Sequence, residues 1–243
     1  FAMKRYDAYV FLTKEMDSLV NQRHVPSVVI EGLVDINMKD KSNDLANKHS
    51  ERVCLYAGAI EKRYGLESLV EGFMRADSQN CELHVYGAGD YERDLTVAAQ
   101  RESRVKYLGT VPNDHVVEEQ LRATLLLNPR PTSEAFTKYS FPSKNMEYMA
   151  SGTPMLTTLL PGMPEEYLPH VYVLQDESPE GIAAALDRVL ALDDEELYQK
   201  GRSAKEFVLA KKNNVLQAGR VIQLLAECQR SRIDSQPRGS NDA

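Results

Sequence analysis

Short apolar runs alternate along the chain with longer amphipathic stretches. The runs have strand length and end at glycine, proline or polar residues, whereas the stretches place apolar residues at helical spacing. The predicted strands are Ala8–Leu12, Ser27–Ile30, RVCLYAG, CELHVYG, VKYLG, TLLLN, PMLTT and VYVL. Strands that alternate with helices of about 10 to 15 residues predict an α/β fold with a doubly wound parallel sheet, Rossmann-like, followed by C-terminal helices.

The carboxyl ends of these strands are the expected ligand-binding edge, because open parallel sheets bind ligands there. The loops predicted at this edge are Gly58–Gly65, Gly87–Tyr91, Gly109–Asp114, Asn128–Lys144 and Thr157–Glu166. In addition, the polar run INMKDKSNDLANKHSER predicts a linker or a surface excursion after the first two strands. The helices are expected to begin at marked caps, with Asn113 or Asp114 capping one and Ser178 another.

The segment SFPSKNMEYMASG carries the most specific local chemistry. Pro142 and Ser143 suit a helix start, and Gly152 suits its end. The free amides and positive dipole at such a start bind anions, and Lys144 adds a full charge. Ser143 and Glu147 are four residues apart and share a face, so the carboxylate could hold a diol one turn from a phosphate. The alternative is that Glu147 only offsets the helix dipole and Lys144 is solvated.

Composition narrows the class of protein. The 243 residues are 42% hydrophobic and 27% charged, which is typical of a globular chain. A net charge of −7 disfavours nucleic acid as a partner. The scattered cysteines Cys54, Cys81 and Cys228 predict a reducing, cytoplasmic location, and the histidines show no metal-ligating spacing. The longest uncharged run contains two glycines and three prolines, so no transmembrane segment is expected.

Three stretches together resemble a known family. They are LYAGAIEKRYGLESLVEGF, LHVYGAGDYERDL and GTVPNDHVVEEQLRATLLLNPRPTSEAFTKYSFPSKNMEYMASGTPMLTT. In this order they resemble the donor half of glycosyltransferase family 4, whose members are retaining enzymes of the two-domain GT-B fold. The resemblance runs from about Arg52 to the final helix. It implies transfer of a hexose-type sugar from a nucleotide-diphosphate sugar, without a cofactor or metal.

The resemblance also implies roles for individual residues. Glu147 would hold the donor ribose, and Ser143 and Lys144 would meet the diphosphate. Glu134, in a Glu-Ala-Phe context, is the expected contact of the transferred sugar. It lies five residues farther upstream of Glu147 than the family's glutamate usually does, and Tyr139 occupies that usual position. Catalysis would therefore depend on Glu134 and Lys144.

Two positions depart from the family pattern. An arginine and a lysine that contact donor phosphates are replaced by Ala59 and Tyr64. Arg130 is the favoured substitute because arginine grips phosphate through two donors, and Lys138 comes next. The further candidates Lys62 and Arg63 are expected to be solvated instead.

Two glycines complete the expected donor site. Gly58 would allow close approach to the donor, and Gly87 would lie in a turn that lines the donor cleft. The sequence VYGAGD is not a dinucleotide fingerprint, because Glu92 replaces its third glycine. An oxidoreductase is therefore disfavoured.

The expected domain division follows the resemblance. Residues 1–45 are expected to be the end of an acceptor-side domain plus a linker, 46–230 the donor domain, and 231–243 a disordered tail. The expected partners are the donor and a glycan or lipid-linked acceptor, bound through an N-terminal domain that the sequence lacks, with peripheral association at the inner membrane face. On this view the 243 residues bind donor but transfer sugar weakly. The alternatives are an impaired nucleotide-sugar-binding scaffold and a nucleotide-sugar epimerase.

Overall fold

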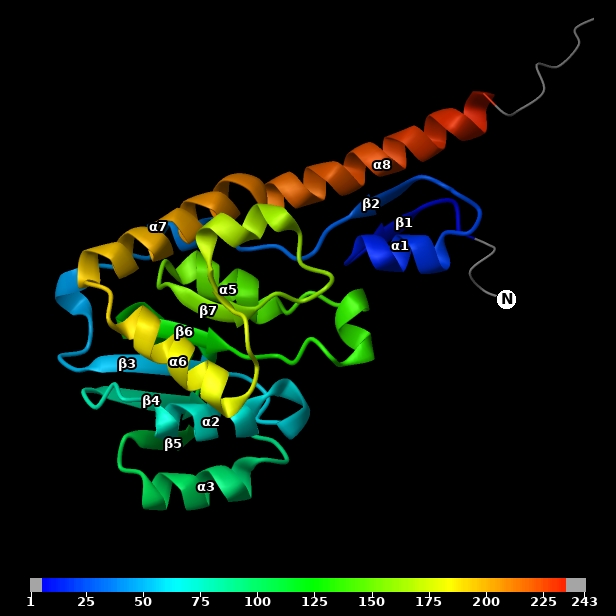
Figure 1. Cartoon of the computed structure of the whole chain (residues 1–243). Coiled ribbons are helices and arrows are strands. Elements are labelled where there is room, and N and C mark those ends of the chain that lie inside the picture. The colour runs from blue at the N-terminus through cyan, green and yellow to red at the C-terminus, as the bar shows by residue number, and fades with distance from the viewer. Residues whose placement is uncertain (1–5, 235–243) are drawn as a thin grey trace, which may run out of the picture.

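The computed structural model of the chain describes residues 6–234. Its main sheet has six strands in the order β5-β4-β3-β6-β7-β8, and every pair is parallel. The strands are β3 (Arg52–Ala57), β4 (Cys81–Tyr86), β5 (Val105–Gly109), β6 (Leu125–Asn128), β7 (Met155–Thr158) and β8 (Tyr172–Leu174). The predicted doubly wound α/β fold is confirmed (Figure 1).

Helices cover both faces of this sheet. One core cluster packs α2 (Leu66–Arg75), α3 (Glu92–Arg101) and α6 (Pro179–Leu190) against the strands. The cluster on the other face contains buried residues of α4 (Asn113–Arg122), α5 (Ser143–Ser151) and α7 (Asp194–Lys211). The central strands β3 and β6 are buried from both sides, which explains why they are nearly continuous apolar runs rather than alternating ones.

The first residues form a small separate unit. Strand β1 (Tyr9–Phe11), helix α1 (Lys14–Val20) and strand β2 (Ser27–Val29) make a two-stranded parallel sheet that does not join the main one. Helix α8 (Asn214–Asp234) contacts β2, and Figure 1 shows it running from the helices of the main sheet past this unit.

Backbone hydrogen bonds and a buried ion pair attach the small N-terminal unit to the main domain. Val34 donates to the carbonyl of Lys212, and its own carbonyl accepts from Asn214. The Lys212 amine lies 3.1 Å from a Glu31 carboxylate oxygen and 2.7 Å from one of Glu166, and the Lys212 side chain is only 7% exposed. Glu166 lies in the 3₁₀ helix η6 (Glu165–His170), which follows β7.

The predicted polar linker is ordered by polar contacts and by Met38, which packs against the core cluster of α4, α5 and α7. It forms two short 3₁₀ helices, η2 (Ile36–Asp40) and η3 (Leu45–Asn47). Asn43 donates to the Ser151 carbonyl and the Thr153 hydroxyl, which attaches the linker to the end of α5.

Several predicted boundaries are confirmed and one is wrong. Ser178 caps α6 by accepting from the Gly181 amide, and α5 ends at Gly152 with φ of 80°. Asn113 and Asp114, however, do not cap α4. Pro112 occupies the cap position with an extended backbone, so both residues fall inside the first turn. An acidic residue there still interacts favourably with the helix dipole.

The predicted disordered tail is only partly within the structure. Helix α8 continues to Asp234, so residues 231–234 are helical. Residues 235–243 lie outside the described residues.

Candidate active site

The candidate site lies where the strand order reverses, between β3 and β6. The chain leaves β3 to build β4 and β5 on one side, then returns to build β6, β7 and β8 on the other. At such a switch point the loops after the two central strands diverge and leave a crevice for a ligand. The loop after β3 and the loop after β6 therefore frame the site.

Glycines let these loops approach one another closely. Gly87 has φ of 131°, and a Cβ atom at this position would lie 1.8 Å from the Gly58 carbonyl oxygen. The Gly58 amide donates to the Tyr86 carbonyl, and the Gly87 amide donates to the Gly109 carbonyl. The loops after β3 and β4 thus continue the sheet as packed backbone, which brings the two predicted site glycines into direct contact.

Helix α5 is fixed with its first turn near the ends of β3 and β6. The buried Tyr148 hydroxyl accepts from the Ala57 amide and donates to the Ala57 carbonyl, at the last residue of β3. Asn128, the last residue of β6, donates to the Asn145 side chain at 2.5 Å. No side chain caps the helix, and Ser143 at its first position is exposed. The Asn145 amide already donates to the Pro142 carbonyl, so the two amides before it in the helix are the ones available to an anion.

The side chains of Lys144 and Glu147 lie side by side on this helix and form an ion pair. The Lys144 amine lies 3.2 Å and 3.0 Å from the two carboxylate oxygens of Glu147. Both side chains are about one-third exposed, at 33% and 30%. The side-chain amide of Gln120 on α4 donates to Glu147 at 2.6 Å. This carboxylate is thus oriented from two sides while part of it still faces solvent.

The predicted phosphate-binding cation Arg130 stands two residues after β6. Its guanidinium carbon lies 4.2 Å from the centre of the Tyr64 ring and 5.8 Å from that of Phe136. Lys62 and Arg63, by contrast, are on the surface and paired with carboxylates, as the solvated interpretation predicts.

Glu134 and Lys138 lie on the same loop after β6. Glu134 is half-buried at the start of the 3₁₀ helix η5 (Ala135–Tyr139), and Lys138 is exposed within it. Among the described residues, neither charged group has a hydrogen-bond or ion-pair partner. Both side chains are therefore free to meet a ligand, whereas Glu147 is already held in place.

Three polar residues of the site were missed from the sequence. Gln120 and Asn145 are fully buried and Asn128 nearly so, although all three side chains are polar. The amide nitrogen of Asn145 is buried without a partner among the described residues. The only available signal was position, since Gln120 falls four residues after Val116 on the inward face of its helix.

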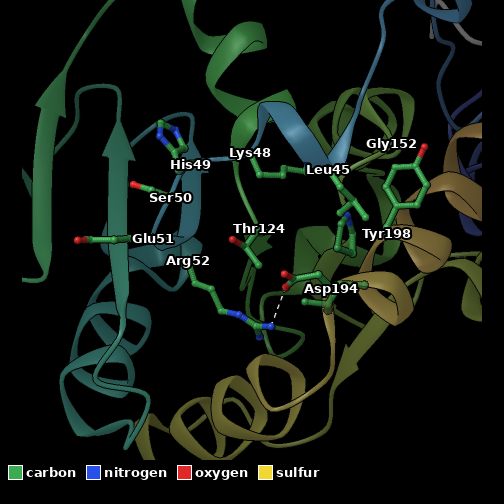
Figure 2. Close-up of a pocket in the computed structure, with 12 residues that line it drawn as sticks. Leu45, Lys48, His49, Ser50, Glu51, Arg52, Thr124, Gly152, Asp194 and Tyr198 are labelled. Atoms are coloured by element: carbon green, nitrogen blue, oxygen red, sulfur yellow. Dashed lines mark hydrogen bonds and ion pairs between the residues drawn. The ribbon is translucent and has the colours of Figure 1, made fainter.

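A cavity of about 280 Å³ lies at the opposite edge of the sheet, beside the starts of β3, β6 and β7. Figure 2 shows Arg52 extending toward Asp194, with which it pairs at 2.8 Å. Lys48 donates to the carbonyls of Leu121 and Ala123 and to the Thr153 hydroxyl. These groups are satisfied by one another and stand at the amino ends of the strands, so we place the candidate site at the other edge.

The Lys48 amine should make the free energy of unfolding depend on pH. Burial lowers the pKa of Lys48 to about 8. Between about pH 8 and pH 10 the unfolded chain therefore holds this proton while the folded chain releases it, so the free energy of unfolding rises with pH. We expect a rise of about 1–2 kcal/mol from pH 7.5 to pH 9.5 relative to Lys48→Met, measured by denaturant unfolding. Parallel curves for the two proteins would contradict this assignment.

Within residues 6–234, no group of three or more histidine, cysteine or acidic side chains is arranged to hold a metal ion. No helix in the same range has the length and apolar character needed to cross a membrane.

Solved glycosyltransferases of the GT-B class share this fold. Sucrose-phosphate synthase from Thermosynechococcus elongatus is 19% identical with a TM-score of 0.71, over 93% of this chain and 60% of that one. Anabaena Alr3699/HepE in complex with UDP is 14% identical with a TM-score of 0.76, over 93% of this chain and 65% of that one. A mutant of S. aureus TarM, solved with Fondaparinux, alpha-GlcNAc-glycerol and UDP, is 15% identical with a TM-score of 0.71, over 91% and 44%.

The family is shown by a sequence model. The model described as "Glycosyl transferases group 1" matches residues 51–192, more than half of the chain, and the chain belongs to this family. No curated protein matches the chain significantly. The chain spans between 44% and 65% of the lengths of the three solved structures above.

Proposed function

We propose that the chain binds a nucleotide-diphosphate sugar at the switch point between β3 and β6. The observation that carries this proposal is the uncapped start of α5, with Lys144 and Glu147 one turn apart on it. The amides and Lys144 suit a diphosphate, while the fixed carboxylate suits the two hydroxyls of a ribose. The three solved relatives share the fold, and two of them were solved with UDP.

Each remaining site residue has a place in this proposal. Arg130 and Lys138 on the loop after β6 add positive charge for the diphosphate, as Ser143 adds a hydroxyl at the helix start. Gly58 and Gly87 keep the neighbouring loops free of side chains where the donor approaches. Glu134, whose carboxylate has no partner among the described residues, faces the transferred sugar.

The reaction we propose is transfer with retention to a glycan or lipid-linked acceptor. The bond between the sugar carbon and the diphosphate oxygen breaks, and the acceptor oxygen forms a bond on the same face of the sugar. The acceptor proton passes to the departing diphosphate. Cations and helix amides stabilise that leaving group more strongly as its charge develops, which lowers the barrier. The acceptor-binding groups are proposed to lie in a further N-terminal domain.

Calorimetric titration with uridine, guanosine and adenosine diphosphates tests donor binding. We expect one of the three to bind with a dissociation constant below about 1 mM, which corresponds to about −4 kcal/mol. The absence of binding by all three at millimolar concentration would contradict the proposal and favour a scaffold role. Sugar products analysed after turnover would separate transfer from epimerisation.

Glu134→Ala should affect transfer more than binding. Because the carboxylate is proposed to contact only the sugar, the affinity for nucleoside diphosphate should stay within about twofold, while the transfer rate falls about 10- to 100-fold. Binding is measured by calorimetry on the chain, and transfer by diphosphate release in the full-length enzyme that carries the acceptor-binding domain. Lys138→Ala on the same loop is the matched comparison, since it should weaken diphosphate binding instead. An unchanged transfer rate for Glu134→Ala would remove this residue from the site.

A further inference from the structure

Arg130 has aromatic neighbours but no acidic partner. Its guanidinium carbon lies 4.2 Å from the Tyr64 ring centre and 5.8 Å from the Phe136 ring centre. The two rings themselves meet edge to face, with centres 6.4 Å apart. Among the described residues no carboxylate pairs with the guanidinium, and its Nε atom is buried without a hydrogen-bond partner.

This arrangement differs from that of other arginines that lie partly inside the molecule. Arg52 pairs with Asp194, and Arg104 pairs with Glu102. A buried N–H group without a partner is costly, so its presence calls for a ligand or a water that accepts from it. The planar fork of arginine matches the oxygens of a phosphate, and among the described residues no carboxylate occupies the fork of Arg130.

Direct packing of the loop after β3 against the loop after β6 places Tyr64 beside Arg130. It ends the 3₁₀ helix η4 (Lys62–Tyr64) and precedes Gly65, whose φ is 82°. A Cβ atom on Gly65 would lie 2.2 Å from the carbonyl oxygen of Pro129, the residue just before Arg130. The loop after β3 therefore contacts the loop after β6 at the point where Tyr64 meets Arg130.

An aromatic ring holds a cation in a way that a carboxylate cannot. Stacking on a ring face fixes the guanidinium plane but does not neutralise its charge or occupy its N–H donors. A carboxylate in the same place would neutralise the charge and occupy the donors that a phosphate needs. The Arg63 guanidinium also lies 5.0 Å from the centre of the Tyr64 ring, but it pairs with Glu61. Arg130 is therefore the cation at this ring whose charge is not paired among the described residues.

We propose that Tyr64 is a positioning residue that holds Arg130, through its ring face and with Phe136 behind it, in place to bind the donor diphosphate. This inference rests on the proposed function, since it names the residue that orients one of the phosphate-binding groups. The diphosphate would then be recognised by an arginine of the loop after β6 that stacks on a tyrosine of the loop after β3.

The test compares Tyr64→Leu with Tyr64→Phe by calorimetry. We expect Tyr64→Leu to weaken nucleoside diphosphate binding about 5- to 30-fold, because the ring face is lost. Tyr64→Phe keeps the face and should stay within about twofold of the unmodified chain. Affinity for the nucleoside without phosphates, measured by competition, should not change in either variant. Tyr139→Leu, an exposed tyrosine on the loop after β6, is the control.

A double variant separates positioning from general packing. Arg130→Met should weaken diphosphate binding at least as much as Tyr64→Leu, and adding Tyr64→Leu to it should cause no further loss. Additive losses, equal effects of the leucine and phenylalanine variants, or a parallel loss of nucleoside affinity would each overturn the proposal.

Inorganic pyrophosphate distinguishes failure of this proposal from failure of the proposed function. If nucleoside diphosphates do not bind but pyrophosphate binds in a manner that depends on Tyr64, the function is wrong and the stacked-arginine site stands. If neither binds, both are wrong. If nucleoside diphosphate binds equally well to Tyr64→Leu, only this inference is wrong. The Nε–H resonance of Arg130, followed by NMR during the titration, reports directly whether the guanidinium meets the anion.

Discussion

Glu147→Ala should weaken binding of the nucleoside diphosphate at least about 100-fold. The carboxylate is proposed to accept two hydrogen bonds from the ribose, and hydrogen bonds to a charged group contribute about 1.5–3 kcal/mol each. Gln120 and Lys144 already hold this group, so little freedom is lost when the ribose binds. Calorimetric titration of the variant measures the effect.

The specific signature is the loss of ribose discrimination. The unmodified chain should bind a ribonucleoside diphosphate far more tightly than its 2′,3′-dideoxy analogue, which lacks the diol. Glu147→Ala should bind both equally, because Lys144 and the helix amides still meet the phosphates. Glu147→Gln keeps the size of the side chain and tests the charge alone.

Two outcomes would contradict the ribose assignment. One is intact donor binding by Glu147→Ala. The other is a loss of affinity in which the ribose and dideoxy ligands are weakened by the same factor. Thermal unfolding of each variant is the control, because the buried Gln120 loses its partner and the variant should be slightly less stable.

Lys212→Met should lower the free energy of unfolding by about 3–5 kcal/mol. The substitution leaves the carboxylate of Glu31, whose side chain is 8% exposed, buried without its cation. Glu166 is 48% exposed and can be hydrated instead. Because Glu31 precedes the linker and Lys212 lies between α7 and α8, the loss should loosen the small N-terminal unit from the main sheet. Denaturant unfolding measures the stability change.

Matched variants test the cause of that destabilisation. Lys211→Met changes the neighbouring, exposed lysine and should shift stability by less than about 0.5 kcal/mol. Adding Glu31→Gln to Lys212→Met removes the unpaired charge and should recover part of the loss. A change below about 1 kcal/mol for Lys212→Met would show that the buried pair contributes little.

The sequence predicted the architecture because periodicity reports local burial. The runs at β3 and β6 are almost entirely apolar since helices cover both faces of the sheet, and this pattern is visible without any long-range knowledge. The start of α5 at Ser143 and its end at Gly152 follow from proline and glycine chemistry, which is also local.

The missing parts of the site depend on contacts between distant segments. Nothing near Gln120 in the sequence indicates that its amide meets Glu147 on the next helix. Likewise, Tyr64 and Arg130 belong to loops after different strands and meet only because β3 and β6 are neighbours in the sheet. The cap of α4 was misplaced for a different reason, since Pro112 takes the extended backbone that Asn113 was expected to adopt.

A crystal structure of the chain with a bound nucleoside diphosphate tests the central claim most directly. The claim predicts both phosphates beside the first turn of α5, within about 3.5 Å of the Arg130 guanidinium or the α5 amides, and the ribose hydroxyls on Glu147. A nucleotide bound at the opposite edge of the sheet, in the cavity beside Lys48 and Arg52, would contradict it. So would phosphates at the switch point that touch neither Arg130 nor the start of α5.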